Sequence, residues 1–155
     1  MDNIPRFLII GNYDNINKVI DKLPNKYKIN NYYLYNIINP FIEYGYNIYK
    51  NDNDFHFKII VCPEEGLTAD ILNSSYINTL TGLIICCNDK SNIDSYKIFA
   101  DKISTHENIY IWFDKKYIDY QGKDFHCLFD DNLWQDRLYK YIEYPINSSY
   151  NCNIL

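Results

Sequence analysis

Short apolar runs alternate with amphipathic stretches along the chain. Three runs have the composition of buried strands, namely Arg6–Ile10, Gly82–Cys87 and Asn108–Phe113, and the second is apolar on both faces, as a central parallel strand requires. Two other segments, Asn15–Leu23 and Asn92–Ser104, carry apolar residues at helical spacing. The alternation of strand and helix predicts an α/β domain with a mostly parallel sheet that helices cover on both faces.

A hairpin is predicted early in the chain. The segments Phe41–Tyr49 and Phe55–Cys62 have strand composition, and Asn51-Asp52-Asn53-Asp54 between them is a turn signal. This hairpin adds one antiparallel strand to the predicted sheet. Weaker patterns predict a helix over Ala69–Leu80, a helix over Leu133–Tyr139 and a last short strand over Tyr141–Pro145, whereas Asn30–Asn39 has no clear preference.

Composition and charge indicate a single globular domain over residues 1–155. Apolar residues make up 47% of the chain and charged residues 23%, which is ordinary for a domain with one core. A net charge of -5 without a Lys/Arg run disfavours nucleic acid as a partner. No apolar run reaches the roughly 18 residues of a membrane span.

Cysteine usage and the N-terminal sequence predict an intracellular protein, in the cytoplasm or the nucleus. The five cysteines are odd in number and fit no zinc spacing, which favours free, buried thiols in a reducing compartment. The N-terminus has neither the charge pattern nor the apolar run of a signal peptide. The three histidines show no catalytic or ligand spacing, so no catalytic residue is assigned.

The turn after the first strand stands where a phosphate-binding loop would lie. Such a loop reads G-x-x-x-x-G-K-[ST] and holds phosphate with backbone N–H groups and a lysine. Counting from Gly11, the second glycine is Ile16, the lysine is Asn17 and the hydroxyl residue is Lys18. Asp14 adds a negative charge inside the loop. The pattern predicts a retained loop scaffold that has lost its phosphate chemistry.

Five stretches resemble motifs of the Ras-like small GTPases, and among them of the Ran group. The similarity runs from about Arg6 to Asn151, over FLIIGNYDNINKVI, FHFKIIVCPEEGL, GLIICCNDKSNIDSYK, ENIYIWFDKKYID and, most weakly, YIEYPINSSYN. The last stretch is similar to the strand, S-A-K loop and S-N-Y-N segment of Ran-like proteins. The resemblance implies a three-layer P-loop fold with one antiparallel strand, in which the family's C-terminal helix is missing.

The residues that carry the family's chemistry are mostly replaced. In the second stretch Pro63 replaces the metal-linked aspartate and Leu67 the water-orienting glutamine, while Gly66 remains. In the fourth stretch Lys116 stands at the asparagine of N-K-x-D, and Asp119 remains. Because magnesium needs oxygen ligands and hydrolysis needs magnesium, neither a metal site nor GTP hydrolysis is expected.

These losses imply a pseudo-GTPase that acts as a protein-interaction module and binds no nucleotide. Its contact surface would include Tyr32, Tyr33 and Tyr35, which fall where the first switch of the family lies, because tyrosine is enriched at interfaces. The implied partner is a nuclear-transport or vesicle-trafficking protein, and an apolar face left by the missing helix would permit self-association. The composition is typical of AT-rich codon usage, so a parasite or a large DNA virus that mimics a host GTPase would fit it.

Two alternatives stay open. One is a divergent GTP-binding protein with weak guanine nucleotide binding and little or no hydrolysis, in which Gly11, Lys18, Gly66 and Asp119 would contact GTP or GDP with magnesium. The other is a flavodoxin-like or Rossmann-like enzyme, which the early hairpin and the absence of G-x-G-x-x-G disfavour. An all-parallel sheet would oppose the Ras-like interpretation, and a second strand antiparallel to the rest would support it.

Overall fold

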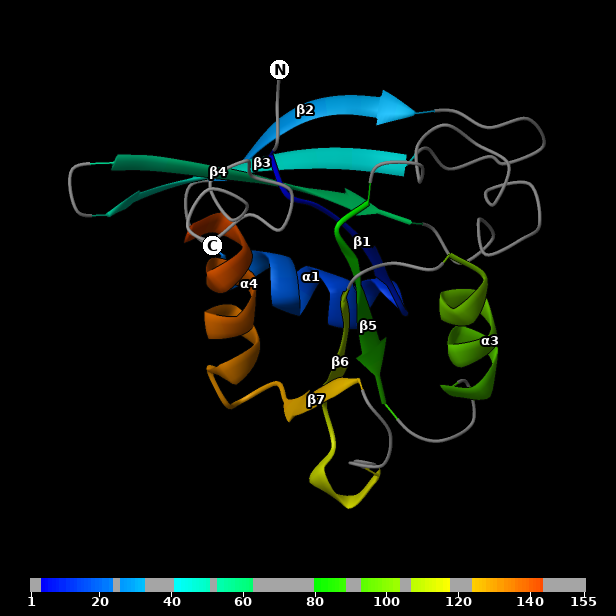
Figure 1. Ribbon diagram of the computed structural model, residues 1–155. Coiled ribbons are helices and arrows are strands. Elements are labelled where there is room, and N and C mark those ends of the chain that lie inside the picture. The colour runs from blue at the N-terminus through cyan, green and yellow to red at the C-terminus, as the bar shows by residue number, and fades with distance from the viewer. Residues whose placement is uncertain are drawn as a thin grey trace, which may run out of the picture.

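The computed structural model describes residues 4–23, 26–32, 41–50, 53–62, 80–88, 93–103, 107–117 and 124–143 (Figure 1). These residues form a seven-stranded sheet with helices on both of its faces. In chain order the elements are β1 (Arg6–Ile10), α1 (Tyr13–Asp21), β2 (Lys26–Tyr32), β3 (Phe41–Lys50), β4 (Asn53–Val61), β5 (Gly82–Cys87), α3 (Ile93–Ile103), β6 (Glu107–Trp112), the 3-10 turn η3 (Lys115–Tyr117), β7 (Phe125–Leu128) and α4 (Leu133–Glu143).

The strands follow the order β2-β3-β4-β1-β5-β6-β7 across the sheet. Strand β3 is antiparallel to both of its neighbours, β2 and β4, and the pairs β4–β1, β1–β5, β5–β6 and β6–β7 are all parallel. One strand therefore runs against six others. The expected α/β class, the mostly parallel sheet and the early hairpin, seen as β3–β4, are confirmed.

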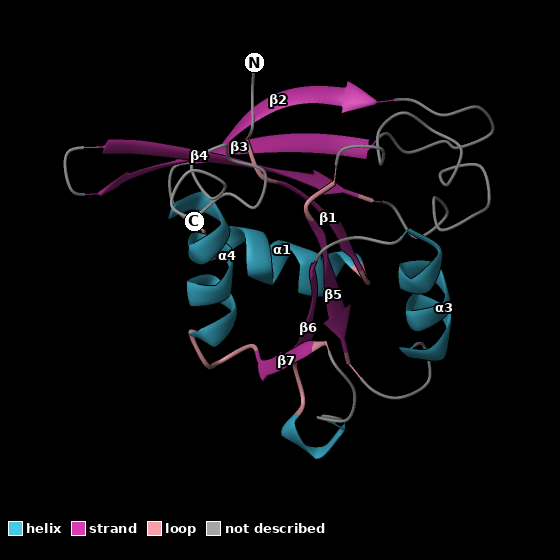
Figure 2. Ribbon diagram, in the orientation of Figure 1, coloured by secondary structure: helices cyan, strands magenta, loops and turns pink. Residues whose placement is uncertain are grey.

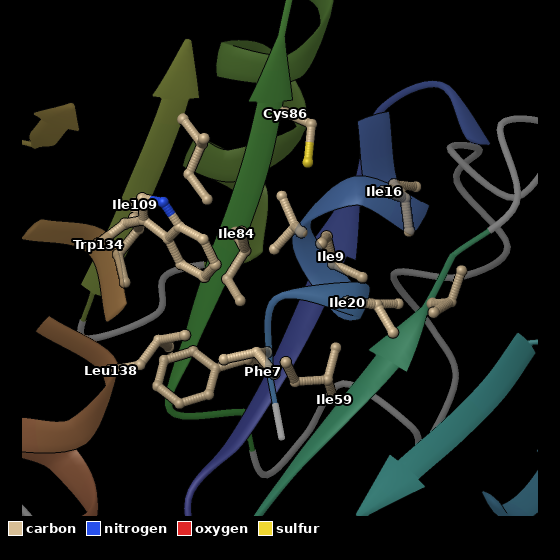
Figure 3. Packing of buried hydrophobic residues seen from close by; sticks show 14 of the residues in the cluster. Phe7, Ile9, Ile16, Ile20, Ile59, Ile84, Cys86, Ile109, Trp134 and Leu138 are labelled. Carbon is tan, nitrogen blue, oxygen red and sulfur yellow. The ribbon is translucent and has the colours of Figure 1, made fainter. Parts of the chain in front are cut away.

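Alternate residues of each central strand enter two separate cores. Phe7 and Ile9 of β1 pack with α1 and α4 on one face, whereas Leu8 and Ile10 pack with α3 on the other (Figures 2 and 3). This alternation follows from the period of two in a strand. Because both faces are covered, β1, β5 and β6 are apolar almost throughout, as buried parallel strands are.

The end of the described chain differs from the sequence prediction. Tyr141–Glu143, predicted to begin a last strand, belong to α4, and the last described strand is the short β7, which the sequence analysis did not predict. A helix therefore follows the last described strand, and the expectation that this helix is missing is wrong. Residues 144 and 145 lie outside the described part of the chain.

Contacts of Tyr141 explain why the helix continues. Its ring lies edge-on to Phe7, with 5.9 Å between centroids, and its hydroxyl donates to Glu107 Oε2. Arg137, one turn earlier, donates to the same oxygen at 3.1 Å. Glu107 is buried, and a buried carboxylate needs such partners, so α4 is held to the start of β6 by a polar cluster.

Strand β2 is the second element that the pattern did not predict. Its sequence, KYKINNY, is polar and covers the start of the segment without clear preference. It pairs with β3, and the register shifts between Lys28 and Asn30, so Ile29 forms a bulge. Edge strands are often polar and bulged, which explains the weak apolar signal. Of the helix predicted over Ala69–Leu80, residues 69–79 lie outside the described ranges.

Candidate functional site

The carboxyl ends of β1, β5, β6 and β7 meet at one edge of the sheet, because these strands are parallel. The strands between β1 and β5 in the chain lie on one side of β1, and the strands after β5 lie on the other. Ligands of open α/β sheets bind outside the carboxyl ends at such a reversal point. The turn at Gly11, where the sequence predicts a phosphate loop, lies at this point.

The turn from β1 to α1 consists of Gly11 and Asn12 alone. Gly11 has φ +141°, a backbone conformation that L side chains rarely adopt. A Cβ at this position would lie 2.7 Å from the Cys86 Cβ and 2.9 Å from the Cys86 carbonyl oxygen. Glycine is therefore required at residue 11 by the conformation of the turn and by the close approach of β5.

Helix α1 begins too early for a phosphate loop. It starts at Tyr13, so the positions counted as the second glycine, the lysine and the hydroxyl residue are Ile16, Asn17 and Lys18 inside the helix. Ile16 is fully buried in the core that α1 shares with β1 and β5 (Figure 3). The prediction that the loop scaffold is retained is wrong, because motif counting assumed an extended loop where the chain is helical.

Asn12 caps the start of α1. Its Oδ1 accepts a hydrogen bond from the Asn15 amide at 2.9 Å, and its carbonyl accepts from the Ile16 amide at 3.0 Å. The backbone has the extended conformation typical of an N-cap. A helix N-terminus can bind an anion through its free N–H groups, but here a side chain takes one of them. Asp14 in the first turn adds negative charge there.

A hydrogen bond crosses the reversal point. Asn15, which is 4% exposed, donates through Nδ2 to Asn88 Oδ1 at 2.7 Å. Asn88 directly follows β5 and is exposed. The bond joins the first turn of α1 to the carboxyl end of β5. Together with the contact between Gly11 and Cys86, it places the protein's own groups where a ligand would enter.

Aromatic rings cover the carboxyl ends of β6 and β7. Phe113 and Phe129 stack with 4.6 Å between centroids, and Phe129 lies 6.2 Å from Trp134. Lys22 Nζ lies 4.1 Å from the Phe129 centroid and donates to the Phe129 carbonyl at 3.4 Å. The sequence did not predict this cluster, because it gave no signal for β7, whose end brings Phe129 beside Phe113.

Lys18, the candidate replacement for the phosphate-loop lysine, is exposed on α1. Its Nζ lies 5.9 Å from the centroid of Phe113, which directly follows β6. The side chain therefore extends toward the aromatic cluster. Lys116, at the former asparagine position, is also exposed, and its amide donates to Asp114 Oδ1 at 2.9 Å within the turn after β6.

The other predicted site residues are only partly described. Tyr32 is the last residue of β2, at the end of the outermost described strand. The remaining ones lie outside the described residues, namely Tyr33, Tyr35, Pro63, Gly66, Leu67 and Asp119. The structure thus brings Gly11 and Lys18 to the same edge of the sheet and does not place the other nucleotide-binding candidates.

Four of the five cysteines are described, and all four are free and buried, as expected. Burial raises the pKa of each thiol, and it raises that of Cys127 to about 12. These thiols are therefore protonated near neutral pH and poor nucleophiles. Across the described ranges, no group of three or more His, Cys, Asp and Glu residues could hold a metal ion. No helix among the described residues is long and apolar enough to cross a membrane.

Neither a scan against models of protein families nor a search of curated proteins finds a match for this chain. The functional inference therefore rests on the geometry of the carboxyl edge, the edge of the sheet where the carboxyl ends of β1, β5, β6 and β7 lie.

Proposed function

We propose that this chain is a degenerate small-GTPase-like domain that acts as a protein-interaction module, binds no guanine nucleotide and hydrolyses no GTP. The observation that carries this proposal is the two-residue turn of Gly11 and Asn12. A phosphate site needs several successive N–H groups that point at one anion, usually with a lysine. A turn of this length, closed by its own cap, offers no such loop.

The direction of β3 supports the Ras-like part of the proposal. An early antiparallel strand in an otherwise parallel sheet is the feature that distinguishes this interpretation from an all-parallel flavodoxin-like or Rossmann-like sheet. The helix after β7 adds to this support, since the family ends in a helix. The Ran-like assignment loses its main sequence argument, because Tyr141–Glu143 of the fifth stretch are helical.

The recognition surface that we propose lies at the β2 end of the sheet. Tyr32 closes β2, and Tyr33 and Tyr35 follow it in the chain. Tyrosine gives a large contact area at a small entropic cost and is enriched in binding hot spots. Without a γ-phosphate to order and release its loops, the domain presents this surface in one state. An intracellular nuclear-transport or vesicle-trafficking protein is the proposed partner.

A capture experiment tests the recognition surface. The wild-type chain and a Tyr32→Ala, Tyr33→Ala, Tyr35→Ala variant are each presented to purified nuclear-transport and vesicle-trafficking proteins. Ile98→Ala serves as the matched control, because Ile98 is an exposed apolar residue on α3. We expect one partner that the wild type and Ile98→Ala retain and the triple variant loses. If the wild type, Ile98→Ala and the triple variant all retained the partner equally, the result would contradict the proposed surface.

The alternative of weak guanine nucleotide binding has its own test, because it depends on Lys18. If labelled GTP or GDP bound, Lys18→Ala should weaken binding more than Lys22→Ala, whose ammonium already contacts Phe129. Our proposal predicts that neither GTP nor GDP binds to the wild type or to either variant.

A further inference from the structure

Strand β7 is held to the sheet through an unusual side-chain contact. It is four residues long and is the outermost described strand beside β6. His126 in its middle lies opposite Tyr110 of β6 in the parallel register. The two rings stack almost in parallel, with 4.5 Å between centroids and 6° between planes. A strand this short depends strongly on its side-chain contacts.

The imidazole of His126 also accepts a hydrogen bond. Trp112, two residues after Tyr110 on β6, donates from Nε1 to His126 Nδ1 at 3.1 Å. Trp112 is 1% exposed, so water does not readily replace this acceptor. A buried donor that loses its acceptor loses free energy. The bond between Trp112 and His126 therefore helps to keep β7 on the edge of the sheet.

This contact fixes the protonation state of His126. An indole nitrogen can only donate, so His126 Nδ1 must carry a lone pair, and the imidazole must be neutral with its proton on Nε2. A protonated imidazole donates from both nitrogens. Turning the ring over presents a second donor to Trp112. In no orientation does the cation accept the indole proton, so protonation breaks the bond.

Charged groups near the pair make protonation accessible. Asp124, directly before β7, and Asp101 on α3 act on the Tyr110 hydroxyl and, after burial as the largest cause, raise its pKa. Asp124 also accepts from Asn108 Nδ2 at 3.5 Å. These carboxylates favour a positive charge beside Tyr110, while the indole opposes it. The charged and titratable groups that act on Tyr110 are Asp124, Cys87 and Asp101, and Lys97 on α3 acts on Cys87.

We propose that His126 is a pH-sensitive lock that holds β7 to β6 when neutral and releases it when protonated. Histidine titrates between pH 5 and 8, within the range of cellular compartments. The release reaches the carboxyl edge, because the Phe129 amide, one residue past β7, donates to the Trp112 carbonyl at 2.8 Å. Phe129 is the central ring of the aromatic cluster. Mild acid should therefore loosen the cover of that edge.

Amide hydrogen exchange measures this lock directly. Protection factors, corrected for the intrinsic effect of pH on exchange, are compared at about pH 7.5 and about pH 5.5. We expect protection of the amides over 125–129 to fall roughly tenfold on acidification, with β1 unchanged, because one buried donor loses its acceptor. Unchanged protection over 125–129 in the wild type would overturn the proposal.

Two variants separate the lock from general acid sensitivity. His126→Asn keeps an acceptor near the Nδ1 position without a titrating ring, so its protection should not depend on pH. His56→Asn removes an exposed histidine on β4 and should behave as the wild type. The same loss of protection in His126→Asn would overturn the proposal.

The tautomer gives a readout that needs no variant. Imidazole ¹⁵N chemical shifts of the wild type should show the proton of His126 on Nε2 at neutral pH, and the indole signal of Trp112 should shift as His126 titrates. A proton on Nδ1 at neutral pH, or an indole signal of Trp112 that does not shift during the titration of His126, would also overturn the proposal.

Discussion

Gly11 and Cys86 are packed so tightly that a Cβ on Gly11 would lie 2.7 Å from the Cys86 Cβ. The contact joins the turn after β1 to β5 at the point where a ligand of an α/β sheet would enter. It explains why residue 11 must be glycine without any need for a bound phosphate. The glycine that begins the resemblance to a P-loop thus has a packing role.

Gly11→Ala should destabilise the fold by about 3 kcal/mol. Backbone strain at a left-handed φ and the clash with Cys86 contribute roughly equally, at about 1–3 kcal/mol each. Urea unfolding measures the loss. Asn17→Ala, on the exposed face of α1, is the control and should change stability by less than about 0.7 kcal/mol, since only helix propensity differs. A Gly11→Ala variant as stable as the control would contradict the described turn.

Restoring the letters of the phosphate motif should not restore its function. The triple change Ile16→Gly, Asn17→Lys, Lys18→Ser places glycine in a helix and empties a fully buried core position. We expect a loss of about 3–6 kcal/mol from the cavity and the helical glycine together, and no gain of GTP binding. Thermal unfolding with and without GTP and magnesium measures both. A variant stabilised by the nucleotide would show that an extended loop can form.

The hydrogen bond between Asn15 and Asn88 should appear as a coupling in a double-mutant cycle. Asn15→Ala, Asn88→Ala and the double variant are unfolded in urea. Because the Asn15 amide is buried and Asn88 accepts from it at 2.7 Å, we expect a coupling energy of about 0.5–1.5 kcal/mol. The Asn12→Ala cap variant, expected to cost about 1 kcal/mol, shows that the assay detects changes in this turn. Additive effects of Asn15→Ala and Asn88→Ala would contradict the bridge.

Stability should fall as pH rises above about 8.5. Burial raises the pKa of the thiols of Cys62, Cys86, Cys87 and Cys127, and that of Cys127 reaches about 12. In the unfolded chain a thiol ionises near pH 8.5, so above that pH the folded state binds more protons than the unfolded state. Each retained proton then lowers the free energy of unfolding by about 1.4 kcal/mol per pH unit.

Urea unfolding under reducing conditions from pH 7.5 to 10 measures this slope, and Cys127→Ala should reduce it by about one proton. If the measurement is continued above about pH 10, the slope should become steeper, since burial also raises the pKa of Tyr46, Tyr110 and Tyr141. A stability that is constant over this range would mean that the thiols are accessible to solvent.

Much of the sheet could be predicted from the sequence because burial on both faces leaves a strong signal. Gly82–Cys87 is apolar at every position, and the structure gives the same limits for β5. The polar β2 and the four-residue β7 lack that signal, since edge strands bury less surface. The end of α4 was not predicted because tyrosine, as at Tyr141, is typical of strands. The residues that Tyr141 contacts in the helix, Phe7 and Glu107, lie far away in the chain.

The candidate site was predictable in position but not in shape. The sequence placed the candidate loop at Gly11, directly after an apolar strand, and in the structure this turn lies at the reversal point of the sheet. Counting the motif from Gly11 assumed an extended loop as far as Ile16. Asn12, however, is a favourable N-cap, and the helix begins directly after it. The contacts that close the edge, between Asn15 and Asn88 and between Phe113 and Phe129, join residues distant in sequence. No local pattern encodes them.

The most direct test of the account is a titration of the purified chain with fluorescent GTP and GDP, with and without magnesium, beside an active small GTPase. A turn of two residues and a bridged reversal point predict no saturable binding up to about 100 μM, so that any binding free energy is weaker than about −5.5 kcal/mol. Guanine-selective binding at about 1 μM or tighter, strengthened by magnesium, would contradict the account at its centre.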